Sequence, residues 1–165
     1  MQMGLTPSPM AVVCVRLFQP GDEAAFRSLN EEWIAKTFGL EEEDRITLSD
    51  PGGRILEPGG RILIAVAESG PIGCCALRPI GPGVFEIAKM AVAEGHRGRG
   101  IGRKLLEYAI AQAKAVGAVR LYLETNSQLA NAIHLYESVG FRHLPPERVK
   151  PSAYARADTY MEMML

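Results

Sequence analysis

The chain has 165 residues, of which 47% are hydrophobic and 22% are charged, as in an ordinary globular domain large enough for a core of its own. Its formal net charge of -1 gives no overall attraction to nucleic acid or to an anionic membrane, so we expect neither as a partner. The longest apolar run, residues 62–67, is too short to span a bilayer.

The N-terminal region predicts a tail, a first strand and a first helix. Residues 1–10 contain two prolines but no basic and apolar signal regions, so we expect a flexible tail, a cytoplasmic protein and one domain over residues 11–165. The β-branched, apolar run 11–18 predicts a first strand. Hydrophobic residues then recur at helical spacing over 22–37, and Asp22 stands at the N-cap of this predicted helix.

The middle of the chain combines a short helix, a loop and a strand meander. Residues 41–48 open with acidic side chains, which stabilise a helix N-terminus. Two Pro-Gly-Gly clusters predict a loop over residues 50–60 rather than a domain boundary. Glycine–proline turns separate three apolar runs, which predict antiparallel strands at 61–67, 73–77 and 84–92.

The second half alternates helices and strands. Leucine and alanine recur at helical spacing over residues 100–116, and residues 129–139 predict another helix; a glycine follows each. Further strands are predicted at 119–124, from residue 141, and at 158–165. The order β-α-α-β-β-β-α-β-α-β-β indicates an α/β fold with a single mixed sheet flanked by helices and no internal repeat.

The cysteines and histidines show no metal-ligand spacing, and the sequence predicts no metal site. Cys74 and Cys75 are adjacent in an apolar run, where successive side chains of a strand point to opposite faces. We expect both to be small buried hydrophobic side chains.

The segment between the third meander strand and the next helix is rich in glycine and arginine. Its residues are Arg97, Gly98, Arg99, Gly100, Ile101, Gly102 and Arg103. Alternate glycines let an anion approach the backbone, and the first amides of the following helix have no partner inside it. Those amides lie at the positive end of the helix. The segment therefore predicts a phosphate-binding loop.

The spacing of this glycine loop excludes two common nucleotide-binding motifs. A P-loop requires G-x-x-x-x-G-K-[ST], and a Rossmann fingerprint requires G-x-G-x-x-G within a βαβ unit. A solvated connector and an RNA-binding RG segment are alternatives, although such RNA-binding segments are longer and disordered. Because the loop lies between two strongly patterned elements, we favour phosphate binding.

Two motifs resemble signatures of the GCN5-related N-acetyltransferase (GNAT) family. The first is R-x-x-G-x-G after a strand, here residues 97–102. The second is N-x-x-A-x-x-L-Y-x-x-x-G-F, and its register is loose at the alanine. The residues that carry it are Asn131, Ile133, Leu135, Tyr136, Gly140 and Phe141. The predicted element order also resembles the family's. The resemblance covers nearly the whole chain after the tail and implies a GNAT-type fold and acetyl-CoA-dependent N-acetyltransferase activity.

The resemblance also implies how acetyl-CoA would bind. Its pyrophosphate would contact the amides of residues 97–103, and its pantetheine arm would pair with the backbone of the preceding strand as an added strand does. The strand residues concerned are Met90, Ala91 and Val92. Asn131 and Asn126 resemble further cofactor contacts, although Asn131 equally fits a surface position and Asn126 an N-cap.

Two side chains resemble the family's catalytic residues. Tyr136 would be the general acid, although a core tyrosine with a satisfied hydroxyl is the alternative. Glu86 would be the general base; it could instead lie at a solvated edge or bind the acceptor's amino group. Glu124 is the second candidate base. Lys89 lies three residues beyond Glu86, so we expect it on the opposite strand face.

The acceptor implied by the resemblance is an amine, either a small molecule or a peptide. Selectivity is expected to arise from residues 33–60 and 144–158. The acidic run 41–44 would favour a cationic amine if it lies near the acceptor, but a solvated helix start explains it equally well. A catalytically silent acyl-CoA-binding module, acting as a sensor or structural subunit, is the alternative function. Dimers are common among such folds, so a homodimer stays open.

Overall fold

The computed structural model describes residues 13–165, which form one seven-stranded mixed sheet in the order β1-β2-β3-β4-β5-β7-β6. The strands are β1 (Cys14–Leu17), β2 (Arg61–Ala67), β3 (Gly70–Gly81), β4 (Val84–Val92), β5 (Arg120–Thr125), β6 (Arg142–His143) and β7 (Thr159–Met164). The α-helices are α1 (Glu23–Thr37), α2 (Glu42–Ser49), α3 (Ile101–Ala115) and α4 (Ala130–Val139). The predicted tail, residues 1–10, lies outside the described residues.

The predicted elements agree with this order, and the sheet is mixed and flanked by helices as expected. The main difference lies in residues 50–60, where the structure has a turn of π-helix at Gly52–Leu56 instead of an irregular loop. The reason is Ile55, which is fully buried and packs with Phe26 and Leu48. A buried apolar side chain between the two glycine clusters requires an ordered backbone.

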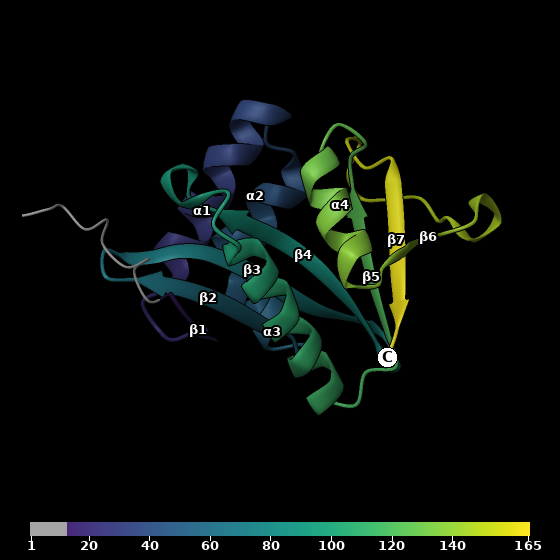
Figure 1. The fold of residues 1–165 in the computed structure, drawn as a ribbon, viewed down its shortest axis with the longest axis horizontal. Coiled ribbons are helices and arrows are strands. Elements are labelled where there is room, and N and C mark those ends of the chain that lie inside the picture. Colours follow the sequence, from purple (N-terminus) through teal and green to yellow (C-terminus); the bar gives the residue numbers. More distant parts are fainter. Residues whose placement is uncertain (1–12) are drawn as a thin grey trace, which may run out of the picture.

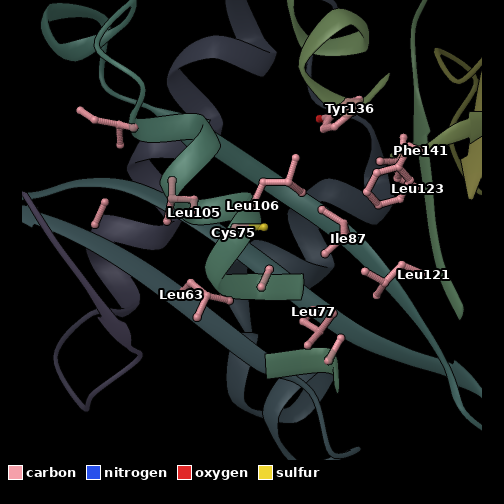
Figure 2. Close-up of a cluster of buried hydrophobic side chains, with 14 of the residues drawn as sticks. Leu63, Cys75, Leu77, Ile87, Leu105, Leu106, Leu121, Leu123, Tyr136 and Phe141 are labelled. Carbon is pink, nitrogen blue, oxygen red and sulfur yellow. The ribbon is translucent and has the colours of Figure 1, made fainter. Parts of the chain in front are cut away.

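The sheet has one hydrophobic layer on each face. Helices α3 and α4 cover one face, while α1 and α2 cover the other (Figure 1). Cys75 packs in the α3 layer with Leu105 and Leu106, as Figure 2 shows. Cys74 packs in the opposite layer with Phe26. The prediction that the two cysteines are buried on opposite faces is therefore confirmed.

Strand β4 is paired on both sides only over its first half. It runs antiparallel to β3 along its length, but its parallel pairing with β5 extends only from Val84 to Ile87. The two strands then separate, because β5 leads into α4 while β4 continues towards the glycine loop. The β5-facing edge of residues 88–92 consequently has no strand partner.

A β-bulge lies in this second half of β4. Lys89 and Met90 together face the single residue Cys75 on β3, the arrangement of a bulge. Lys89 adopts φ 52°, which is unusual for a residue other than glycine. The bulge shifts the alternation by one residue, so Lys89 shares the α1/α2 face with Glu86. The expectation that they lie on opposite faces was wrong for this reason.

Candidate active site

A cavity of about 520 Å³ lies where β4 and β5 separate. Its walls come from the second half of β4, the C-terminal end of β5, the first turns of α4, the last turn of α1 and the loop before β7. The cavity is lined from both faces of the sheet, since Tyr136 comes from the α4 side and Trp33 from the α1 side. A ligand between the strands could therefore meet a second ligand from the opposite face.

The unpaired edge of β4 forms one wall of this cavity. Met90, Ala91 and Val92 all line it, and the β5 side of this segment offers backbone donors and acceptors to a ligand in place of a neighbouring strand. An extended chain with amide groups fits such an edge. The Val92 carbonyl already accepts a hydrogen bond of 3.0 Å from Nε of Arg97, at the end nearest the glycine loop.

The glycine loop presents a row of backbone donors. Gly98 and Gly100 have φ values of 76° and 77°, a left-handed conformation that glycine adopts without strain. Within the described residues, no backbone or side-chain acceptor binds the amides of residues 98–103. A Cβ atom added at Gly102 would lie 3.4 Å from Leu135 on α4. The loop thus combines free amides with close helix packing, which suits a bulky anion.

The three arginines of the loop have different surroundings. Arg97 reaches back to β4, as described above. Arg103 donates a 2.6 Å hydrogen bond to the Ser138 hydroxyl and so connects α3 to α4. Arg99 is exposed at the loop tip, where its charge is available to an anion.

Tyr136 lies at the margin of the α3 layer (Figure 2). It is 8% exposed, and its ring meets the edge of Phe141 at 6.1 Å between centroids. Its side chain lines the cavity, and its hydroxyl has no hydrogen-bond partner among residues 13–165. A core tyrosine with a satisfied hydroxyl is therefore not what the structure shows. Burial raises the pKa of Tyr136, with a smaller contribution from Cys75, so the hydroxyl keeps its proton at neutral pH.

Glu86 lies on the cavity floor, on the α1/α2 face of β4. Burial raises its pKa to about 7; Arg78 opposes this effect and nearby Glu124 reinforces it. The Arg78 guanidinium is 3.5 Å from the Glu86 carboxylate, across the β3–β4 pair. A carboxylate with this pKa exchanges a proton near neutral pH, as a general base must.

Glu124 lies on the same sheet face, two residues beyond the β5 position that pairs with Glu86. It accepts hydrogen bonds from the Tyr122 hydroxyl at 2.8 Å and from the Ser152 hydroxyl at 2.7 Å. Both candidate bases therefore line one cavity, as does Tyr136.

The two predicted asparagine contacts also line the cavity. The Asn126 amide nitrogen donates to the Arg156 carbonyl at 2.7 Å, and its side-chain oxygen accepts from the Gln128 amide at 2.8 Å. Asn126 thus stabilises a turn before α4, whose N-cap is Leu129, so the N-cap alternative was wrong. Asn131 is exposed in the first turn of α4.

A buried ionic cluster at the wall of the cavity was not predicted from the sequence. We call Asp44, Lys89, Tyr154 and Arg156 the Asp44 cluster. Lys89 lies 2.5 Å from the fully buried Asp44 carboxylate, and Arg156 binds both oxygens of that carboxylate at 2.6 and 2.7 Å. The Tyr154 ring lies 4.5 Å from each of the two cations. The cluster connects α2 and the β4 bulge to the loop before β7.

The acidic run 41–44 opens α2, and Glu42 is exposed there as a solvated helix start predicts, but Asp44 fits neither interpretation of the run. Asp44 is neither solvated nor free to bind a cationic ligand, because two cations of the chain already bind it. Glu41 accepts a 2.8 Å hydrogen bond from the Ala155 amide and pairs with Arg156. Lys89, in a strand that is apolar except for Glu86, was the sequence signal of this arrangement, because a buried charge requires a partner.

Two features are absent from residues 13–165. No helix in that range is long and apolar enough to cross a membrane. No group of three or more His, Cys, Asp or Glu side chains there is arranged to hold a metal ion.

The sequence matches the model of the acetyltransferase (GNAT) family over residues 23–141. It is also similar to "uncharacterized N-acetyltransferase YjgM" of Escherichia coli (strain K12), with 30% identity over 145 residues that cover 83% of this chain and 86% of that protein.

Solved structures share the fold at lower sequence identity. An acetyltransferase of the GNAT family from Staphylococcus aureus Mu50 superimposes with a TM-score of 0.83 and 19% identity, over 92% of this chain and 98% of that one. The structure of yncA from Salmonella typhimurium with its cofactor acetyl-CoA has a TM-score of 0.72 and 21% identity, over 92% and 93% of the two chains. At these identities the likeness shows the fold alone.

Proposed function

Because this chain belongs to the acetyltransferase (GNAT) family, we propose that it transfers the acetyl group of acetyl-CoA to the amino group of an acceptor by direct attack in a ternary complex. The observation that carries the proposal is that one cavity contains Glu86, Tyr136 and the unpaired edge of β4. The acceptor is a small-molecule or peptide amine.

The residues around the cavity fit acetyl-CoA. The free amides of residues 98–103 would hold its pyrophosphate, with Arg97 and Arg99 supplying positive charge. The edge of β4 at Met90–Val92 would pair with the amide groups of its pantetheine arm. When bound, acetyl-CoA supplies the thioester whose acetyl group is transferred. Asn131, which lines the same cavity, would contact the pantetheine arm from α4.

Glu86 would act as the general base. An amine is protonated at neutral pH and must lose a proton before it can attack. With a pKa of about 7, a substantial fraction of Glu86 is ionised at neutral pH and can accept that proton, directly or through a water molecule. The positive charge of Arg78 lowers the pKa of Glu86 and so opposes the rise that burial causes.

Tyr136 would act as the general acid. Its hydroxyl holds a proton, is buried, and has no acceptor of its own among the described residues. It can therefore donate that proton inside the cavity to the thiolate leaving group of CoA. Tyr136 then regains a proton, through solvent, from the nitrogen of the newly formed amide. The protons balance, because the acceptor loses its first proton to Glu86 before attack and its second proton, from the amide nitrogen, restores Tyr136.

Direct attack is supported by where the cysteines lie. A two-step transfer would need a nucleophile of the protein beside the thioester. Cys74 and Cys75 are fully buried in the two hydrophobic layers, and neither they nor Cys14 line the cavity.

The proposal is tested first by binding and then by turnover. Acetyl-CoA at about 100 times its Kd should stabilise the protein by about 3 kcal/mol, which raises Tm by about 5–11 °C for a chain of this size. CoA release should then be measured with a panel of amines. If acetyl-CoA raises Tm but no amine releases CoA, the catalytically silent module is correct. If acetyl-CoA has no effect on Tm, both functions are refuted.

A further inference from the structure

One carboxylate in the cavity has hydrogen bonds but no counter-charge. Glu124 accepts from the hydroxyls of Tyr122 and Ser152, and no lysine or arginine of residues 13–165 lies within 4.0 Å of it. Two neutral donors fix the orientation of a carboxylate without neutralising it. The side chain is therefore held ready for a cation that enters the cavity.

Two of the three cations that line the cavity are already bound by other carboxylates. Lys89 and Arg156 both contact Asp44. Arg78 faces Glu86 across the β3–β4 pair. The third lining cation, Arg97, makes no ion pair among residues 13–165 but lies at the glycine-loop end of the cavity, where its Nε binds the Val92 carbonyl. A carboxylate on an acceptor bound beside Glu124 and Glu86 would consequently find no free cation there. Such a group is costly to desolvate.

The wall that faces these carboxylates is apolar. Trp33 and Phe38, at the end of α1, meet edge to face with 6.3 Å between their ring centroids, and both line the cavity. Leu129 and Ala132 line it from the α4 side. Apart from the buried indole N–H of Trp33, which has no partner among residues 13–165, these surfaces are apolar and suit an aliphatic or aromatic body.

We propose that the acceptor is a hydrophobic primary amine without a carboxylate beside its amino group, and that Glu124 binds this acceptor in its ammonium form. The inference depends on the proposed acetyl transfer and specifies its second substrate. Glu124 holds the ammonium group, the Trp33–Phe38 wall holds the apolar body, and the ammonium loses one proton to the Glu86 carboxylate. The neutral amine that results is the attacking nucleophile.

The test compares amines that differ by one carboxylate. CoA release is measured at saturating acetyl-CoA with 2-phenylethylamine, with phenylalanine, and with phenylalanine methyl ester as a control for size. We expect kcat/KM for phenylethylamine to exceed that for phenylalanine by on the order of a hundredfold, since the added charge has no partner. The ester should resemble the amine, because it lacks the charge.

A variant then tests the assigned residue. Glu124→Gln should raise KM for phenylethylamine by about tenfold to a hundredfold, as expected for a lost charge-assisted hydrogen bond, while kcat and the acetyl-CoA effect on Tm change little. Glu137→Gln, which changes an exposed glutamate on α4, is the matched control and should leave KM unchanged. Should Glu124→Gln fail to fold, the comparison of amines on the unaltered protein still decides the acceptor class.

The outcomes separate the two proposals. Equal turnover of phenylalanine and phenylethylamine, or an unchanged KM in Glu124→Gln, would overturn the assignment while acetyl transfer stands. Turnover of carboxylate-bearing amines alone would also overturn it. Acetyl-CoA binding without CoA release for any amine would refute acetyl transfer and, with it, this assignment.

Discussion

Replacing Asp44 with asparagine should destabilise the protein strongly, because two buried cations depend on this carboxylate. Burial alone would raise the pKa of Asp44, but hydrogen bonds from Arg156 and Lys89 outweigh it and lower the pKa from 3.8 to about 2. At about 1.4 kcal/mol for each pKa unit, this shift corresponds to about 2–3 kcal/mol of stabilisation from the charge of Asp44.

The full effect of Asp44→Asn should be larger than this value. Lys89 has 4% of its side-chain surface exposed and Arg156 has 16%, so both would keep their charge away from solvent without a carboxylate partner. Removal of one member of a buried ionic group costs about 3–5 kcal/mol. For a chain of this length the loss corresponds to a fall in Tm of about 6–20 °C.

Urea denaturation followed by circular dichroism measures this loss. Glu42→Gln, on the exposed face of the same helix, is the control and should change stability by less than about 0.5 kcal/mol. The folded-state pKa of Asp44 is depressed, so its stabilisation is present above about pH 4 and is lost as the pH falls towards 2. The difference between the variant and the unaltered protein should narrow over that range. If Asp44→Asn costs no more than Glu42→Gln, the ionic cluster does not stabilise the fold as argued.

Three further predictions concern the cavity. Glu86→Gln should abolish the rise of kcat/KM with pH around 7, because the ionised carboxylate is the active form above its pKa; a pH–rate profile that keeps this rise would exclude Glu86 as the base. Tyr136→Phe should lower kcat by about a hundredfold, within the range for a lost general acid, while acetyl-CoA raises Tm as before. An unchanged kcat would return Tyr136 to a packing role. Gly100→Ala should cost about 1–2 kcal/mol because its φ of 77° is left-handed, and it should weaken acetyl-CoA binding in a thermal-shift titration. Gly95→Ala, where the added Cβ meets no atom within 4 Å, should do neither.

The sequence predicted most elements well because their boundaries depend on local chemistry. The limits of β2 and β4 match the predicted ranges, and those of α3 and α4 differ by one residue. Glycines in left-handed conformations, such as Gly117 and Gly140, mark where those helices end. The extra length of β3 was missed, because proline and glycine at its ends are turn signals that neighbouring strands override.

The candidate site was only partly readable from the sequence. The glycine loop could be predicted because its spacing is local and its free amides follow from the helix start. The bulge at Lys89 could not be predicted, since nothing in the side-chain alternation of β4 shows where two of its residues face a single residue of β3. Asp22 illustrates the same limit: it stands at the N-cap of α1, yet its carboxylate binds Arg16 and the Gln19 amide instead of capping the helix.

The sequence by itself determined the element order, the acyl-CoA family signatures and the anion-binding loop, because each depends on residues close together in the chain. Tertiary structure alone decided which charges remain available in the cavity. Asp44 and Lys89 are far apart in sequence and become partners only when α2 packs over the bulge of β4. Glu124 is left without a counter-ion by the same folding event, because partner choice among charges depends on three-dimensional distance and burial.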